Sequence, residues 1–296
     1  MLDRASTFSD PEVVRLLKTR FIPVAIDQAY QRRQQDAEGR FYQRIANQGP
    51  RKVGRGTTQG LYVATADGRF LGFNNNRGSN RVKRLLKKVL ADFRPAGVRP
   101  IARGKPDARY VRIPPEGGLV IRVTSKVLGG YAETDDKWRK LFQQSLGRDN
   151  LWVRRDEHQS LVRGAVQESL KKRLARFHLV DNTRGEPPMW KASEIKKLDV
   201  SLEDGQLRGT VHLQTASGDR GYEAQLLGRV ASKGGRVTRF DVVVKGVFWG
   251  EGTYTRGAPR GRFPFAVAFT LASGSGDVAD KVPPQGSRGW LDGYIR

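Results

Sequence analysis

Aromatic, acidic and basic side chains gather in one glycine-rich segment of the sequence, from Trp249 to Pro259. Trp249 and Tyr254 offer flat ring faces, and Glu251 and Arg256 carry opposite charges. Apolar surface with a few well-placed polar groups is typical of a small-molecule site, so we expect a binding loop here. The alternative is a structured loop that only covers the end of a sheet.

A second set of candidate residues lies on the strands around this loop. Apolar and polar residues alternate between residues 206 and 271, which gives the predicted sheet one apolar and one polar face. The polar face carries Arg208, Thr210, His212, Gln225, Arg229, Thr238 and Asp241. A concave polar face would hold a ligand, whereas the alternative is an ordinary solvated face. The candidate ligand-binding residues are therefore His212, Gln225, Arg229, Trp249, Glu251, Tyr254 and Arg256.

Several chemistries lack the residues that they need. The sequence has no cysteine, which excludes disulfides, thiolate metal sites and cysteine catalysis. Its three histidines, His158, His178 and His212, form no metal-binding motif, and His178 with Asp181 supplies only two ligands. Neither a phosphate-binding glycine loop nor a nucleophile elbow occurs. We therefore assign no metal, no cofactor and no catalytic residue, and acid–base catalysis by carboxylates that meet only in the fold stays open.

Positive charge is in large excess. The chain has 54 Lys and Arg against 30 Asp and Glu, a net charge of +24, which favours weak, non-specific contact with nucleic acid or another polyanion. The alternative is that the charge serves solubility or the solvated faces of helices. Two clusters supply the candidate contact residues, which are Lys83, Arg84, Lys87, Lys171, Lys172, Arg173 and Arg176.

The elements that must position these residues fall into two parts, and the first spans residues 1–94. Asp10 and Pro11 begin a helix well. A buried strand is expected at Phe21–Asp27, a polar helix at 31–47, a hairpin from 60–65 and 69–73, and a basic amphipathic helix at about 80–93. The order is helix, strand, helix, hairpin, helix.

This order, with the runs Thr7–Val13 (TFSDPEV), Phe21–Asp27 (FIPVAID) and Tyr62–Gly68 (YVATADG), resembles thioredoxin-like families over residues 6–93. The resemblance implies an α/β unit without its first strand, and we expect residues 97–125 or the C-terminal part to fill the open sheet edge. The family's CxxC would lie just upstream of residue 6, and its cis-proline falls at Gln59-Gly60. Both halves of the redox site are thus missing, so we expect no thiol–disulfide oxidoreductase activity.

The second part of the chain is predicted to be an α+β domain. Residues 95–117 form a linker, and residues 118–296 hold a strand at 118–125, a short helix at 135–145 and a long helix at about 157–177. An antiparallel meander follows at 198–272, and Gly209, Gly228 and Gly246 within its strands favour a curled sheet packed on the long helix. Trp290 is expected to anchor the C-terminal tail. The fold class is therefore α+β overall.

These features favour a redox-inactive, thioredoxin-like binding or scaffold protein with an unknown protein or small-molecule partner. One alternative is an enzyme of unknown reaction with its site in the curled sheet, and another is a polyanion-binding protein. No run of about 18 apolar residues occurs, so we expect no membrane insertion. We expect a cytoplasmic location for the sequence as it stands, and an extracytoplasmic one if a signal peptide precedes it.

Overall fold

The computed structural model describes residues 6–95, 97, 102, 104–110, 113–274, 277–288 and 291–295. The chain divides into two compact units. The first unit comprises Met1–Leu2, Arg112–Ser287 and Leu291–Arg296, and the second comprises Asp3–Val111 and Arg288–Trp290. The expected linker, 95–117, spans the boundary between them, and Trp290 lies outside the described residues.

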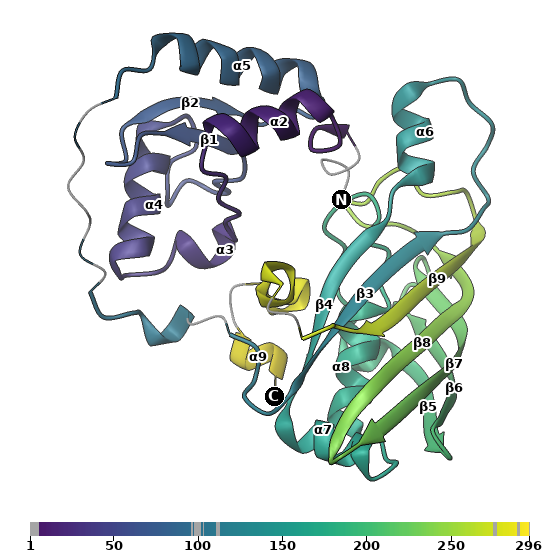
Figure 1. Cartoon of the computed structure of the whole chain (residues 1–296). Coiled ribbons are helices and arrows are strands. Elements are labelled where there is room, and N and C mark those ends of the chain that lie inside the picture. The colour runs from purple at the N-terminus through teal and green to yellow at the C-terminus, as the bar shows by residue number, and fades with distance from the viewer. Residues whose placement is uncertain are drawn as a thin grey trace. The chain divides into compact units, whose positions relative to one another are not determined.

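The second unit is a small helical layer around one hairpin (Figure 1). Its elements are α2 (Pro11–Arg20), α3 (Gln28–Gln31), α4 (Ala37–Gln48), β1 (Leu61–Ala64), β2 (Phe70–Asn74), α5 (Ser79–Asp92) and the 3-10 turn η1 (Ala108–Tyr110). Asp10 caps α2 by accepting hydrogen bonds from the backbone of Glu12 and Val13, at 3.0 and 3.1 Å. Burial of α2 and α5 side chains against β1 makes its core, which holds Val13, Leu16, Val63, Val82, Leu86 and Val89.

One prediction for this unit is wrong, and another is correct only in part. Residues 21–27 are not a strand, and Ile22 and Val24 keep 90% and 72% of their surface exposed. A strand needs a neighbour for its backbone groups, and none of the described residues pairs with this segment, while Pro23 has no N–H to offer. The helix expected at 31–47 is present as α4 but begins only at Ala37, because Asp36 caps its start by accepting from the Gly39 N–H at 3.0 Å.

The first unit holds most of the chain and one seven-stranded antiparallel sheet. Its strands are β3 (Leu119–Val127), β4 (Gly147–Val153), β5 (Ile195–Glu203), β6 (Gln206–Gln214), β7 (Gly221–Lys233), β8 (Arg236–Trp249) and β9 (Arg262–Leu271), in the spatial order β4-β3-β9-β8-β7-β6-β5. Its helices and 3-10 turns are α6 (Lys137–Gln144), α7 (Arg155–Val162), α8 (Glu168–His178), η2 (Ala192–Glu194), η3 (Val278–Lys281), η4 (Gln285–Ser287) and α9 (Leu291–Ile295).

The predicted meander and its buried face are confirmed. Alternating residues of β6 to β9 are buried, among them Leu213, Tyr222, Val244 and Phe265. Asp204 and Gly205, which both have positive φ, form the tight turn between β5 and β6. Residues 119–125 belong to β3 in this sheet, so the expectation that they fill the open edge of the other unit is wrong.

The long helix expected at 157–177 is in fact two helices. Gly164 has φ +78 beyond the end of α7, and its N–H donates to the carbonyl of Leu161. A left-handed residue at this place ends a helix, so the chain turns and begins again as α8.

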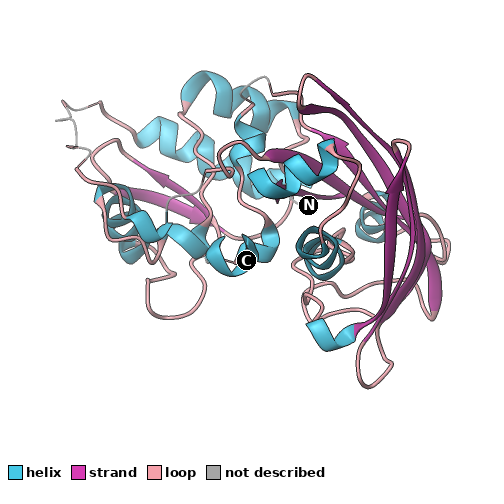
Figure 2. Cartoon of the chain, turned by 90° about the horizontal axis from the view of Figure 1, so that it is seen from below, coloured by secondary structure: helices cyan, strands magenta, loops and turns pink. Residues whose placement is uncertain are grey.

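The sheet curls around α8, which contacts both edge strands, β4 and β5 (Figure 2). Neighbouring strands approach each other closely at two glycines within the curl. A Cβ added to Gly228 would lie 2.3 Å from the Asp241 carbonyl oxygen, and a Cβ added to Gly246 would lie 2.0 Å from the Glu223 carbonyl oxygen. The apolar face is therefore the concave one, and the polar face is convex. The expectation of a concave polar face is wrong, because the helices and the apolar core occupy the inside of the curl.

The space inside the curl is filled. A cavity of about 10 Å³ remains between α8 and the sheet, lined by apolar side chains and Lys171. That volume is about one water molecule, far below what an organic ligand requires. Within the described part of the chain, no helix combines the length and the apolar character needed to cross a bilayer.

Candidate functional site

One group of contacting side chains on the convex face surrounds Trp249, the last residue of β8. Its ring lies flat over Gly221, where a Cβ would be 2.0 Å from the indole, and its Nε1–H donates to the Gly218 carbonyl at 2.9 Å. The Arg262 guanidinium stands 4.1 Å from the ring centroid, at cation–π distance. Contacts with Gly221, the Gly218 carbonyl and Arg262 thus hold the indole in place, and the indole stays partly exposed.

His212 and Trp249, two of the candidate ligand-binding residues, come together here. Their ring centroids are 6.5 Å apart, and the His212 Nε2 lies 3.5 Å from a carboxylate oxygen of Glu223. The other oxygen of Glu223 accepts from Arg262 at 2.5 Å. The sequence reasoning missed Glu223 and Arg262. The strand register was the signal that could have found them, because it pairs His212 with Glu223 and Trp249 with Arg262.

Gln225 and Arg229 lie on the same face of β7 but away from Trp249. Their direct partners on β8 are Lys245 and Asp241, and both side chains are exposed. The structure therefore spreads these candidates along the sheet and does not gather them into a pocket.

The loop after β8 is built to hold its own shape. Glu251 accepts from the backbone N–H groups of Gly257 and Ala258, at 2.8 and 3.1 Å. Thr255 is buried, and its hydroxyl accepts from the Gly252 N–H at 2.8 Å. Glu251 thus has a structural role, which favours the structured-loop interpretation, while Tyr254 and Arg256 remain exposed.

Three apolar side chains lie exposed along β7 and β8 on the convex face. Leu227 and Val243 are direct cross-strand partners and are 62% and 46% exposed, and Val247 lies further along β8 at 36%. A sheet that alternates strictly would place polar residues here. We call Leu227, Val243, Val247, Trp249 and Arg262 the outer patch.

The charges around the outer patch do not balance. The acidic residues of β7 and β8 on this face, Glu223 and Asp241, are each paired with an arginine, Arg262 and Arg239. Arg208, Arg229 and Lys245 stand on the same face, and none of them has a carboxylate within ion-pair distance among the described residues. The face therefore carries net positive charge.

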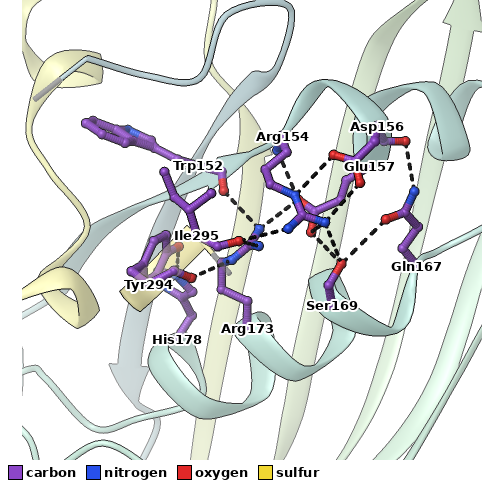
Figure 3. Close-up of polar contacts among 10 residues, drawn as sticks. All are labelled: Trp152, Arg154, Asp156, Glu157, Gln167, Ser169, Arg173, His178, Tyr294 and Ile295. Atoms are coloured by element: carbon purple, nitrogen blue, oxygen red, sulfur yellow. Dashed lines mark hydrogen bonds and ion pairs between the residues drawn. The ribbon is translucent and has the colours of Figure 1, made fainter. Parts of the chain in front are cut away.

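A buried ion pair organises the helices inside the curl (Figure 3). Arg173 on α8 is 2% exposed and donates to the fully buried Glu157 of α7 at 2.7 Å. It also donates to the backbone carbonyls of Tyr294 and Ile295, at 2.9 and 2.5 Å, which holds α9 against α8. The prediction that Arg173 contacts a polyanion is wrong, because the side chain is buried and fully used within the fold.

An acid–histidine–phenol arrangement lies beside this pair. His178 Nε2 is 2.6 Å from the Tyr294 hydroxyl, and its Nδ1 lies 3.0 Å from an Asp149 oxygen. Burial raises the pKa of Tyr294 well above its usual range. His178 and Tyr294 are 2% and 1% exposed, so a substrate has no access and the arrangement anchors α9.

The other buried polar groups are also structural. His158 accepts from the Val237 N–H through Nε2 and donates through Nδ1 to the Gly117 carbonyl. Asp181 binds the Thr183 backbone, the Thr183 hydroxyl and Arg184, so it has no position to share with His178 for a metal. In the described ranges, no group of three or more His, Asp or Glu side chains is placed to hold a metal ion.

The other candidate polyanion contacts differ in whether they already have a partner within the fold. Lys83 and Lys87 pair with acids at the start of α2, since Lys83 lies 3.0 Å from the N-cap Asp10 and Lys87 lies 2.6 Å from Glu12. Lys171 pairs with Glu168 at 2.7 Å. Arg176 donates to the Trp190 carbonyl at 3.2 Å. Arg84 and Lys172 are exposed.

Comparison with protein-family models, with curated proteins and with solved structures gives no match for this chain. The functional interpretation therefore depends on the residues and the geometry of the chain itself.

Proposed function

We propose that this protein works by binding, and that the outer patch contacts an acidic surface of a partner protein. The exposed apolar residues Leu227, Val243 and Val247, on the same face as the fixed Trp249 indole and Arg262, carry this proposal. Tryptophan, tyrosine and arginine are the residues that most often dominate the binding energy at the centre of protein interfaces, where the contacts around them exclude water.

The charge of the face favours one kind of partner. Lys245 lies between Val243 and Val247, and Arg208 is the direct partner of Leu227 on β6. Neither of them, nor Arg229, has an acidic partner among the described residues, so carboxylates on an opposing surface would pair with them. A second copy of this chain is a poor fit, because each copy carries +24 and would present the same positive face. The occupant that complements this face is an acidic protein surface with an apolar centre.

We also propose that residues 6–93 are a thioredoxin-like unit without redox function. The support is the helix–hairpin–helix order together with a sequence that has no cysteine and no proline at Gln59-Gly60. In an insulin-reduction assay, the chain should give no turbidity above the buffer rate. Reduction that the chain accelerates would overturn this part of the proposal.

The binding proposal is tested by capture from cells that make the protein, with two matched variants. L227K/V243K places two charges in the patch, whereas S201K/S232K adds the same charges at exposed positions outside it. We expect quantitative mass spectrometry to find acidic proteins on the wild type and on S201K/S232K, depleted at least tenfold on L227K/V243K. Equal capture by all three proteins would contradict the proposal.

A further inference from the structure

A basic hollow lies in the second unit, along the loop that joins α4 to β1. Its volume is about 360 Å³, and its lining residues are Gly49, Pro50, Arg51, Lys52, Arg55 and Thr57. The volume lies within the usual range of small-ligand sites. None of the candidate ligand-binding or polyanion-contact residues is part of this lining.

The hollow has three cations and no acid in its lining. Among the described residues, no carboxylate lies within ion-pair distance of the Arg51, Lys52 or Arg55 side chain. This differs from Lys83 and Lys87, whose charges are paired, and from Arg173, which is buried. Three like charges facing one hollow repel one another, so an anion that enters it is stabilised by all three.

The backbone of the hollow is held in shape before any ligand binds. The Val53 N–H donates to the Asn47 side chain at 2.9 Å, and the Arg32 guanidinium donates to the Gly56 carbonyl at 3.0 Å. Gly54 and Gly56 have φ of +85 and +96, which glycine adopts at little cost. These contacts restrict the backbone around the hollow.

The chemistry of the cations selects a phosphate group. Each guanidinium of Arg51 and Arg55 can donate two parallel hydrogen bonds to phosphate oxygens, and Lys52 adds a point charge. The Thr57 hydroxyl accepts from the Gln59 N–H at 3.2 Å, which leaves its own hydrogen to donate. We infer that this hollow binds the phosphate group of an anion that carries at least two negative charges. The hollow and the outer patch share no residues, so each proposal is tested independently of the other.

The phosphate can come from a compact anion or from a nucleic-acid backbone, and the experiment separates these sources. We would titrate the full chain with inorganic phosphate, with tripolyphosphate and with a single-stranded oligothymidylate, by calorimetry at about 50 and 200 mM salt. Three phosphate contacts with the oligonucleotide predict an affinity about 20-fold lower at the higher salt. Tighter binding of tripolyphosphate identifies a compact ligand, and tighter binding of the oligonucleotide identifies a nucleic-acid backbone.

Two triple variants with equal charge decide whether the hollow is the site. R51A/K52A/R55A removes the three cations of the hollow, whereas K18A/R139A/R163A removes two arginines and one lysine at exposed positions elsewhere, none of them a candidate polyanion contact. We expect the first variant to bind the preferred probe at least tenfold more weakly, and the second to bind within about threefold of wild type. Equal losses in both variants, or no binding of any probe by the wild type, would overturn the inference. Failure here leaves capture by the outer patch unaffected, so the two proposals are tested separately.

Discussion

At the scale of single residues, the fate of each cation decides what it can do. The Arg173 guanidinium donates its hydrogen bonds to Glu157 and to the backbone of α9. Lys83 is paired with Asp10, whereas Arg51 faces a hollow whose lining holds no acid. Sequence clustering treats such residues alike, because a charge run on a helix does not reveal which side chain turns inward. A net charge therefore says less about binding than the number of cations that the fold leaves unpaired.

The buried pair gives the first prediction. Arg173→Met should lower the free energy of unfolding of the first unit by about 3–5 kcal/mol, because Glu157 would stay buried without its partner. Urea unfolding followed by tryptophan fluorescence measures this, since Trp138, Trp152, Trp190 and Trp249 all lie in that unit. Lys172→Met, one residue away and exposed, is the control and should stay within about 0.5 kcal/mol. Equal stability of the two variants would refute the role of the pair.

Asp10 gives a prediction on pH. Hydrogen bonds from Ser79 and Lys83 lower the pKa of its carboxyl from 3.8 to about 2. A depressed folded-state pKa contributes stability that is present above about pH 4 and is lost as the pH falls toward 2. Asp10→Asn should therefore speed hydrogen exchange of the α2 amides at pH 6, by an amount that shrinks as the pH approaches 2. A difference from wild type that does not change over this range would contradict the assignment.

At the scale of elements, the close approach of strands explains the curl. Gly246→Ala should cost about 1–3 kcal/mol in the unfolding of the first unit, because its Cβ would lie 2.0 Å from the Glu223 carbonyl oxygen in the paired strand. Ser232→Ala, exposed on β7, should be close to neutral. A Gly246→Ala protein as stable as wild type would show that the strands can separate at this point without loss.

The break between α7 and α8 gives a second prediction at this scale. Gly164→Ala should cost about 1 kcal/mol, because a residue with a Cβ is strained at φ +78, although no atom lies within 4 Å of the added group. Gly164→Asn should cost less, because asparagine tolerates the left-handed region. If alanine and asparagine behave alike in urea unfolding, backbone conformation is not what ends α7.

The meander was predictable from sequence because its signals are local. Alternation is read within one strand, and Asp204-Gly205 and Gly234-Gly235 mark their own turns. Three features depend instead on tertiary packing between the helices and the sheet. They are the direction of the curl, the convex position of His212 and the division of the helix at Gly164. The segment 21–27 has the composition of a strand but lacks a neighbour to pair with among the described residues, and composition alone does not reveal this.

The candidate site was only partly predictable for the same reason. His212 and Trp249 were identified by residue type, and the structure does bring them together. Glu223 and Arg262 required the strand register, and the cations of the hollow required the geometry of an irregular loop. Glu251 looked like a ligand-binding acid because its backbone partners lie six and seven residues away.

At the scale of the whole molecule, charge opposes self-association. Each chain carries +24, so sedimentation velocity at about 0.15 M salt should show a monomer, even though the outer patch exposes apolar surface. A dimer that L227K/V243K dissociates and S201K/S232K does not would identify a second copy of the chain as the occupant of the patch, and would contradict the proposal of an acidic partner protein.

The central claim is that the outer patch contacts an acidic partner, and photo-cross-linking from Val243 tests it most directly. A benzophenone amino acid at position 243 should form adducts in cells that make the protein, mapping next to Asp or Glu residues of the partner. The same group at position 233, exposed at the end of β7, is the control and should yield at most a tenth as much. Equal yields at both positions, or no adduct at position 243, would contradict the claim.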